Sequence, residues 1–302
     1  MLYALAFFLL GSAIAWGGGP LPVVTTSTDL KALVEAVGRG RVQVESLAPP
    51  LHDPHAVEVK PGQLAKLKTA ALLVRIGLDH EPWLGRALRT VSDPRFARES
   101  PHYLDTSKGI QLLQAETPRV RADKGTHVHG FGNTHYWLDP ENSRPITSAI
   151  LEALVRLAPA DRLYFDINRR RFLDQLDKRL KGWLATMAPY KGTRVVAVHE
   201  TWPYFGQRFG LIIVGVVEPT PGVPPSPSYL ASLIQKMRDS GIRLIVAEPY
   251  SNASVVKQVA TQTDATAVTL IPSVGGDPEA SDYLSLFDLN IKRFSQSAAP
   301  AR

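Results

Sequence analysis

The chain has 302 residues, of which 44% are hydrophobic and 21% are charged, which is typical of an ordinary soluble globular protein. This balance excludes a collagen, a coiled coil, a disordered chain and a polytopic membrane protein. There is no cysteine, so disulfides, zinc–thiolate sites, iron–sulfur clusters and a cysteine nucleophile are excluded as well. The net charge of +6 is modest and no nucleic-acid-binding motif accompanies it, so nucleic acid is not an expected partner.

The chain begins with an apolar run, Leu2 to Ala15, which ends in the small-x-small pattern Ala13-Ile14-Ala15. Signal peptidase cuts after such a pattern. The run is also too short for a membrane-spanning helix, which needs about 20 residues. We therefore predict a signal peptide over residues 1–15, a linker over residues 16–20 and a periplasmic location.

From residue 21 onward, strand and helix patterns alternate. Strands are predicted at 21–26, 42–47 and 71–76, and helices at 30–37, 61–67, 82–88 and 145–157. A polar loop with glycine and histidine separates the last two helices, over about residues 116–134. This alternation predicts an α/β lobe over residues 21–157.

The longest helical pattern runs from Asp161 to Met187, with apolar residues mostly three or four apart. At about 1.5 Å per residue this helix would be roughly 40 Å long, which exceeds a small lobe. We predict that residues 158–190 link two lobes. The second lobe, over residues 191–302, has predicted strands at 194–198, 211–217, 242–247 and 267–270 and helices at 228–238, 252–262 and 281–294. The predicted fold is two doubly wound α/β lobes with a cleft between them.

Three groups of histidines lie in loops. His55 follows a predicted strand, with His52 close to it, and His199 directly follows another; His127, His129 and His135 lie in the mid-chain loop. Ligands of doubly wound folds bind beyond the carboxyl ends of strands, and neutral imidazole suits Zn²⁺. The residues alone leave two interpretations open, a divalent-metal site shared by the lobes and a set of surface histidines.

A catalytic zinc is the enzymatic alternative, because three histidines and a water molecule also describe a hydrolase site. Such an enzyme needs a general base, for which Glu200 and Glu248 are the candidates. There is no G-x-S-x-G or Walker A motif, and the start of an H-E-x-x-H motif at His199 lacks its second histidine. Catalysis is therefore the less well supported of the two interpretations.

Several segments, in order, resemble the metal-binding extracytoplasmic solute-binding proteins of ABC importers, the zinc and manganese receptor class. The most specific is the segment His135–Pro140, and the resemblance covers nearly the whole mature chain. The other segments are Val23–Thr28 with Leu30, Asp53–His55 with Glu58 and Pro61, Gly77-Leu78 with Glu81 and Trp83-Leu84, His199–Phe205, Ala247–Pro249, and Tyr283-Leu284 with Asn290.

The resemblance implies a receptor that captures a divalent ion and delivers it to a membrane permease, with His55, His135 and His199 as metal ligands. On this ground we predict a binding protein and no enzyme. One position departs from the family, because Ile271 stands where an aspartate ligand is usual. Asp277 or Glu248 could supply the fourth contact, with Glu248 alternatively holding a histidine, or water could fill the position. Purely structural roles for both acids remain open.

Three imidazoles without a clear carboxylate favour Zn²⁺ over Mn²⁺ or Fe²⁺, which prefer more oxygen donors. We expect a monomer. His127 and His129 either form an auxiliary metal site or are surface residues. We predict no ligand role for His52 and His80, and we assign His102 to the surface.

Overall fold

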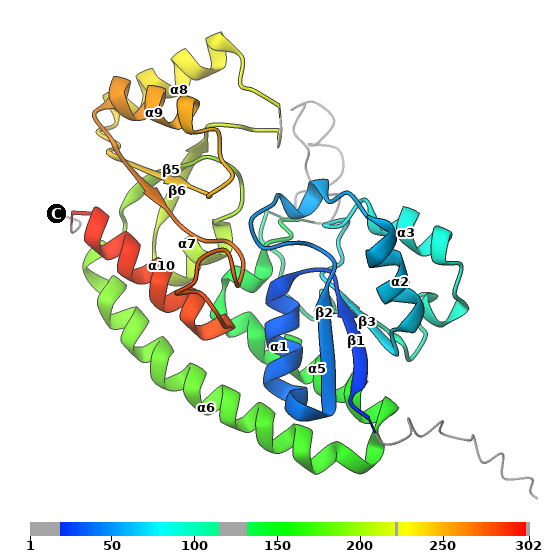
Figure 1. The fold of residues 1–302 in the computed structure, drawn as a ribbon. Coiled ribbons are helices and arrows are strands. Elements are labelled where there is room, and N and C mark those ends of the chain that lie inside the picture. Colours follow the sequence, from blue (N-terminus) through cyan, green and yellow to red (C-terminus); the bar gives the residue numbers. More distant parts are fainter. Residues whose placement is uncertain (1–18, 115–131, 221–222, 300–302) are drawn as a thin grey trace, which may run out of the picture.

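The computed structural model describes residues 19–114, 132–220 and 223–299, which form two α/β lobes (Figure 1). Each lobe contains a four-stranded parallel sheet, and the first strand of each sheet lies inside, next to the second and third. The N-terminal sheet has the order β2 (Val42–Ser46), β1 (Leu21–Thr25), β3 (Leu72–Arg75), β4 (Tyr103–Asp105). The C-terminal sheet has the order β6 (Ile212–Val216), β5 (Arg194–Ala197), β7 (Leu244–Ala247), β8 (Thr266–Thr269).

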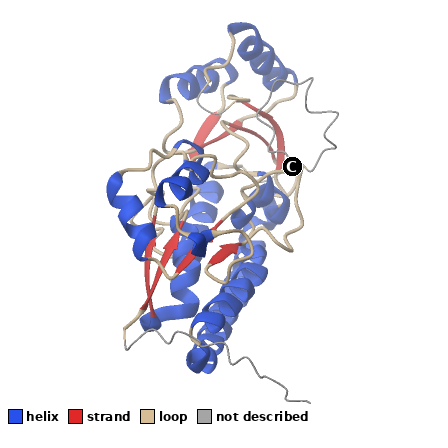
Figure 2. Cartoon of the chain, turned by 90° about the vertical axis from the view of Figure 1, so that its right-hand side faces the viewer, coloured by secondary structure: helices blue, strands red, loops and turns tan. Residues whose placement is uncertain are grey.

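Helices cover both faces of each sheet, which confirms the predicted doubly wound architecture. In the N-terminal lobe, α2 (Pro61–Thr69) and α3 (Leu84–Val91) cover one face, and α1 (Thr28–Gly38) and α5 (Ser143–Leu157) the other. In the C-terminal lobe, α8 (Pro227–Asp239) and α9 (Ala253–Thr263) cover one face, and α7 (Pro203–Phe209) and α10 (Tyr283–Ser297) the other. Figure 2 shows the two sheets one above the other with helices around them.

The predicted long helix is present as α6 (Arg162–Met187), which has 26 residues and runs along both lobes (Figure 1). Its buried face carries Phe165, Phe172 and Trp183 among others. The Asn168 amide donates to the carbonyl of Val37 in the N-terminal lobe. Further along, Trp183 donates through Nε1 to Asp288 of α10. The helix therefore packs on both lobes, as a linking helix should.

The two lobes share part of their apolar core. Each outer sheet face has its own cluster under α2 and α3 or under α8 and α9. The two inner faces share one continuous cluster with α1, α5, α6 and α10. Hydrogen bonds cross between the lobes as well: Trp137 Nε1 donates to the carbonyl of Pro272 at 2.9 Å, and the Val274 N–H donates to Asp29 at 2.9 Å.

Two elements were not predicted, β4 and α7. They have only three and seven residues, which is too few for a hydrophobic pattern with the period of a strand or a helix to be recognised. Within the described residues, no helix is long and apolar enough to cross a membrane. The predicted signal peptide over residues 1–15 and most of the predicted linker lie outside the described residues.

Candidate metal centre

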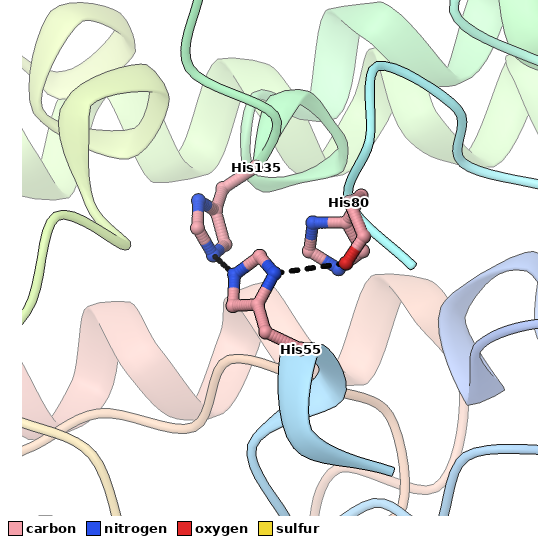
Figure 3. A group of neighbouring side chains, drawn as sticks. All are labelled: His55, His80 and His135. Carbon is pink, nitrogen blue, oxygen red and sulfur yellow. Dashed lines mark hydrogen bonds between the residues drawn. The ribbon is translucent and has the colours of Figure 1, made fainter. Parts of the chain in front are cut away.

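Three histidine side chains from three loops of the N-terminal lobe meet (Figure 3). They are His55, His80 and His135, and one ring nitrogen from each lies within 4.8 Å of the others. The Nε2 atoms of His55 and His135 are 3.3 Å apart. His80 and His135 are buried, and His55 is half-buried. Among the described residues, no other group of histidines and carboxylates has this geometry.

An oxygen atom binds the Nδ1 atom of each ring. His55 Nδ1 lies 2.8 Å from the carbonyl oxygen of His80, and His80 Nδ1 lies 2.8 Å from the hydroxyl of Thr134. His135 Nδ1 lies 3.2 Å from Oδ1 of Asn133. Carbonyl oxygens only accept hydrogen bonds, so Nδ1 of His55 and of His135 carries the hydrogen. In the neutral ring, which is the form of imidazole that binds metals, Nε2 then carries the lone pair.

Two lone pairs that face each other at this distance repel unless a cation lies between them. Two nitrogens bound at about 2.0–2.1 Å to a tetrahedral metal are about 3.3–3.4 Å apart. The separation between Nε2 of His55 and Nε2 of His135 is 3.3 Å. The geometry therefore fits a tetrahedral ion held by imidazoles.

A short 3-10 turn, Pro54–Ala56, holds His55. Asp53 caps this turn, because its Oδ1 accepts a hydrogen bond from the N–H of His55 at 2.8 Å. The carbonyl of Pro54 accepts from Trp83 Nε1 at 2.9 Å. Trp83 immediately precedes α3, so the loop after β2 is tied to the turn after β3.

His80 lies in that turn after β3, where the backbone is strained. Gly77, Leu78 and Asp79 have φ angles of 87°, 55° and 58°. The left-handed region costs a residue with a side chain on the order of 1–2 kcal/mol. At Gly77, a Cβ atom would lie 2.2 Å from the carboxylate of Asp105, so glycine is required there. Strain of this kind is concentrated at functional sites, where the surrounding contacts hold the backbone in place.

The buried carboxylate of Glu81 closes the same turn. Its Oε1 accepts from the N–H of Ile76 at 2.7 Å and from the hydroxyl of Thr26 at 2.6 Å. Its Oε2 pairs with Arg75 at 2.8 Å. These donors and the opposite charge compensate for the burial of the carboxylate. Glu81 thereby fixes the position of its neighbour, His80.

His135 lies just before a second 3-10 turn, Tyr136–Leu138. The Oδ1 atom of Asn133 accepts from the N–H of His135 at 3.0 Å. The Asn133 amide donates in turn to the carbonyl of Glu200, in the C-terminal lobe, at 2.8 Å. The Asn133 side chain therefore links the peptide that carries His135 to the opposite lobe.

Trp137 forms the wall behind the histidines. Its ring centroid lies 5.1 Å from that of His80 and 5.3 Å from that of His135. Because Trp137 also donates to Pro272, the aromatic wall is tied to the C-terminal lobe. Such packing limits the rotation of the two buried imidazoles.

The structure does not bring His199 into this group. His199 follows β5, and both of its ring nitrogens contact carboxylates: Nδ1 lies 2.8 Å from Glu248 Oε2, and Nε2 lies 2.9 Å from Glu218 Oε2. Burial opposes the charged form, but the two carboxylates prevail and raise the pKa of His199 to about 9. The ring is therefore an imidazolium at pH 7.

The two candidate carboxylates also lie outside the histidine group. Asp277 pairs with Arg293 at 2.6 Å. The pKa of Asp277 is lowered mainly by a hydrogen bond from the N–H of Glu279 and, to a smaller extent, by the contact with Arg293. Glu248 contacts His199, as one of the alternatives for this residue anticipated. Ile271 is buried and carries no ligand atom in its side chain.

Of the remaining histidines, His52 is exposed and His102 is half-buried, with Nδ1 2.7 Å from the carbonyl of Ala71. The predictions for His127 and His129 lie outside the described residues. His80, for which we predicted no ligand role, follows β3 at the carboxyl edge of the sheet and lies in the histidine group. The sequence feature that could have drawn attention to His80 is the nearby pair of Gly77 and Glu81, which marks a tight, strained turn after a buried strand.

The family model for the periplasmic zinc-uptake complex component A matches residues 23–297. The high-affinity zinc uptake system protein ZnuA of Yersinia pestis is 26% identical over 265 residues, which cover 84% of this chain and 83% of that protein. The manganese ABC transporter substrate-binding lipoprotein PsaA of Streptococcus pneumoniae is 21% identical, with 98% of this chain and 96% of that protein covered. A zinc-bound crystal structure of a ZnuA deletion mutant superimposes with a TM-score of 0.77 at 22% identity, covering 93% of this chain and 100% of that one.

The fold and the relatives define a two-lobed, metal-binding solute-binding protein of ABC importers. The chain belongs to the family of the periplasmic zinc-uptake complex component A. The resemblance inferred from the sequence motifs is confirmed. Because both zinc and manganese proteins are among its relatives, the family does not by itself decide the metal.

Proposed function

We propose that this protein captures Zn²⁺ outside the cytoplasm and delivers it to an ABC permease, after export by its N-terminal signal peptide and as a monomer. The observation that carries the choice of zinc is the convergence of His55, His80 and His135 without a carboxylate among them. Nitrogen donors in tetrahedral array suit Zn²⁺, whereas Mn²⁺ prefers oxygen donors in octahedral array.

In this proposal the N-terminal lobe binds the metal first. His55 and His135, which the family resemblance implies as ligands, are joined by His80. The buried Nδ1 of His80 is bound to Thr134, so Nε2 is the atom that His80 would offer. His199 of the C-terminal lobe supplies the remaining ligand once it exchanges its contact with Glu218 for the metal.

Zinc titration of the metal-free protein tests this assignment, with a competing chelator to measure the dissociation constant. Loss of a hydrogen-bond partner of a metal ligand typically weakens metal binding about 10- to 100-fold. Because His80→Ala removes a proposed ligand itself, we expect it to weaken zinc binding at least that much. His52→Ala is the matched control, because His52 is exposed and only three residues from His55. Equal affinities for His80→Ala and His52→Ala would remove His80 from the site.

Manganese is the alternative cargo that the relatives suggest. Competition between Zn²⁺ and Mn²⁺ for the wild-type protein decides between them. We expect zinc to displace manganese fully at equal concentrations. Comparable affinities would contradict a nitrogen-only site and point to oxygen ligands.

A further inference from the structure

Three residues that follow neighbouring strands of the C-terminal sheet form a second polar cluster. His199 follows β5, Glu218 follows β6 and Glu248 follows β7. The imidazole lies between the two carboxylates, at 2.8 Å from Glu248 and 2.9 Å from Glu218. The side chains of His199 and Glu218 are 13% and 10% exposed, and that of Glu248 is fully buried.

The two carboxylates are anchored differently. Glu248 accepts through Oε1 from Trp202 Nε1 at 2.8 Å and through Oε2 from the hydroxyl of Ser251 at 2.8 Å, so its position is fixed. Glu218 follows the edge strand of the sheet. Its carboxylate contacts His199 through Oε2, and no other side-chain hydrogen bond anchors it within the described residues.

The two carboxylates also bind different nitrogens, and this difference matters for metal binding. A carboxylate on Nδ1 is the usual outer partner of a metal-binding histidine, since it orients the ring and raises the basicity of Nε2. A carboxylate on Nε2, in contrast, occupies the atom through which the ring would bind the metal. Glu248 therefore supports metal binding by His199, and Glu218 competes with it.

We infer that Glu218 is a positioning residue that holds Nε2 of His199 away from the metal in the metal-free protein. This inference rests on the proposed function, in which His199 contributes a ligand. When the metal arrives, Nε2 gives its proton to water and binds the ion, and Oε2 of Glu218 loses its hydrogen bond. When the metal leaves, Nε2 takes up a proton and returns to Glu218. The contact thus lowers zinc affinity and favours release.

Zinc affinity and zinc dissociation rate, measured by chelator competition and stopped flow, test this role in Glu218→Gln and Glu248→Gln. Loss of a nearby negative charge by itself weakens cation binding, so simple electrostatics predicts a decrease for both variants. We expect opposite signs instead. Glu248→Gln should weaken zinc binding about tenfold. Glu218→Gln should strengthen it about tenfold and slow dissociation, because a charge-assisted hydrogen bond no longer competes.

The His199→Ala background is the control, since Glu218 acts only through His199 in this proposal. There, Glu218→Gln should no longer strengthen zinc binding or slow zinc dissociation, and only the small decrease in affinity expected from loss of the charge should remain. In the metal-free protein, the ¹⁵N chemical shift of His199 Nε2 should differ between wild type and Glu218→Gln. After zinc loading, the two proteins should show the same shift. Should Glu218→Gln misfold, Glu218→Asp, which is one methylene shorter, should give the same change with smaller size.

Two results separate the possible failures. If zinc binds and depends on His135, but Glu218→Gln and Glu218→Asp leave affinity unchanged or reduce it, the positioning role is wrong and the proposed function stands. If wild-type protein does not bind zinc, the proposed function itself is wrong.

Discussion

The two lobes place histidines at equivalent edges of their sheets, but they surround them with different partners. In the N-terminal lobe, the Nδ1 atoms of His55, His80 and His135 contact uncharged oxygens. In the C-terminal lobe, His199 contacts a carboxylate at each nitrogen. Neutral acceptors leave an imidazole able to act as a lone-pair donor, whereas two carboxylates turn it into a cation. The charge of the neighbouring oxygen, and not the topological position, decides which kind of imidazole results.

Removal of an N-terminal ligand should give the largest effect. Structural zinc sites bind with about 10–16 kcal/mol over four ligands, so one ligand contributes about 2.5–4 kcal/mol. We therefore expect His135→Ala to weaken zinc binding by roughly 70- to several hundred-fold, and to abolish most of the rise in melting temperature that zinc gives the wild type. His199→Ala should keep part of this rise, because the N-terminal lobe binds the metal first. Equal losses in the two variants would show that the lobes are equivalent.

The charge on His199 should appear in the pH dependence of stability. The folded pKa of about 9 exceeds the unfolded value of about 6.5, so the interaction stabilises fully below pH 6.5 and is lost as pH rises through 9. The difference corresponds to on the order of 3 kcal/mol. In urea unfolding without metal, wild type should lose stability between pH 7 and 10 relative to His199→Gln. Parallel profiles would contradict an imidazolium at this position.

The outer hydrogen bond of His80 should have a smaller effect. Thr134→Val keeps the shape of the side chain but removes the hydroxyl that contacts Nδ1 of His80 at 2.8 Å. Loss of such a partner typically costs 10- to roughly 100-fold in metal affinity. Isothermal titration with Zn²⁺ measures the change, with Thr69→Val, on the exposed end of α2, as the control. An unchanged affinity would mean that packing against Trp137 alone orients His80.

The bridge between Arg208 and Asp139 should give the smallest effect. Two contacts of 2.7 and 2.8 Å join α7 to the segment after His135. Because Arg208 is partly exposed, we expect Arg208→Met to lower the free energy of unfolding by only about 1 kcal/mol and to leave zinc affinity unchanged. Lys292→Met, which breaks the exposed pair with Glu279, should cause no measurable change. A marked loss of zinc affinity in Arg208→Met would show that this bridge positions the histidines.

The sequence predicted the fold well because its signals are local. Alternating strand and helix periods marked seven of the eight strands, and the uninterrupted pattern from Asp161 to Met187 marked α6. The site depends on contacts between distant residues. His80 contacts Thr134, which lies 54 residues further along the chain, and lies beside His135. The residues next to His80 in the sequence do not indicate either contact. The partners of His199 are likewise set by the order of strands, which places Glu218 and Glu248 on its two sides.

The prediction that His55, His135 and His199 converge on one metal depends on such contacts too. Motif resemblance named these residues, but it does not encode where a ring nitrogen points. The structure brings two of them together and places His80 beside them. Whether His199 joins them on metal binding stays a prediction, which the Glu218 and His199 variants test.

Because one apolar cluster runs through both lobes, neither lobe has a surface at which it could detach without exposing its interior to water. We expect differential scanning calorimetry to show a single heat-absorption peak for the metal-free protein, with equal calorimetric and van't Hoff enthalpies. Amide hydrogens of β1 and β5 should exchange only through this same global opening. We therefore expect the metal to leave without separation of the two lobes, so that movements of individual side chains around the histidines limit its release.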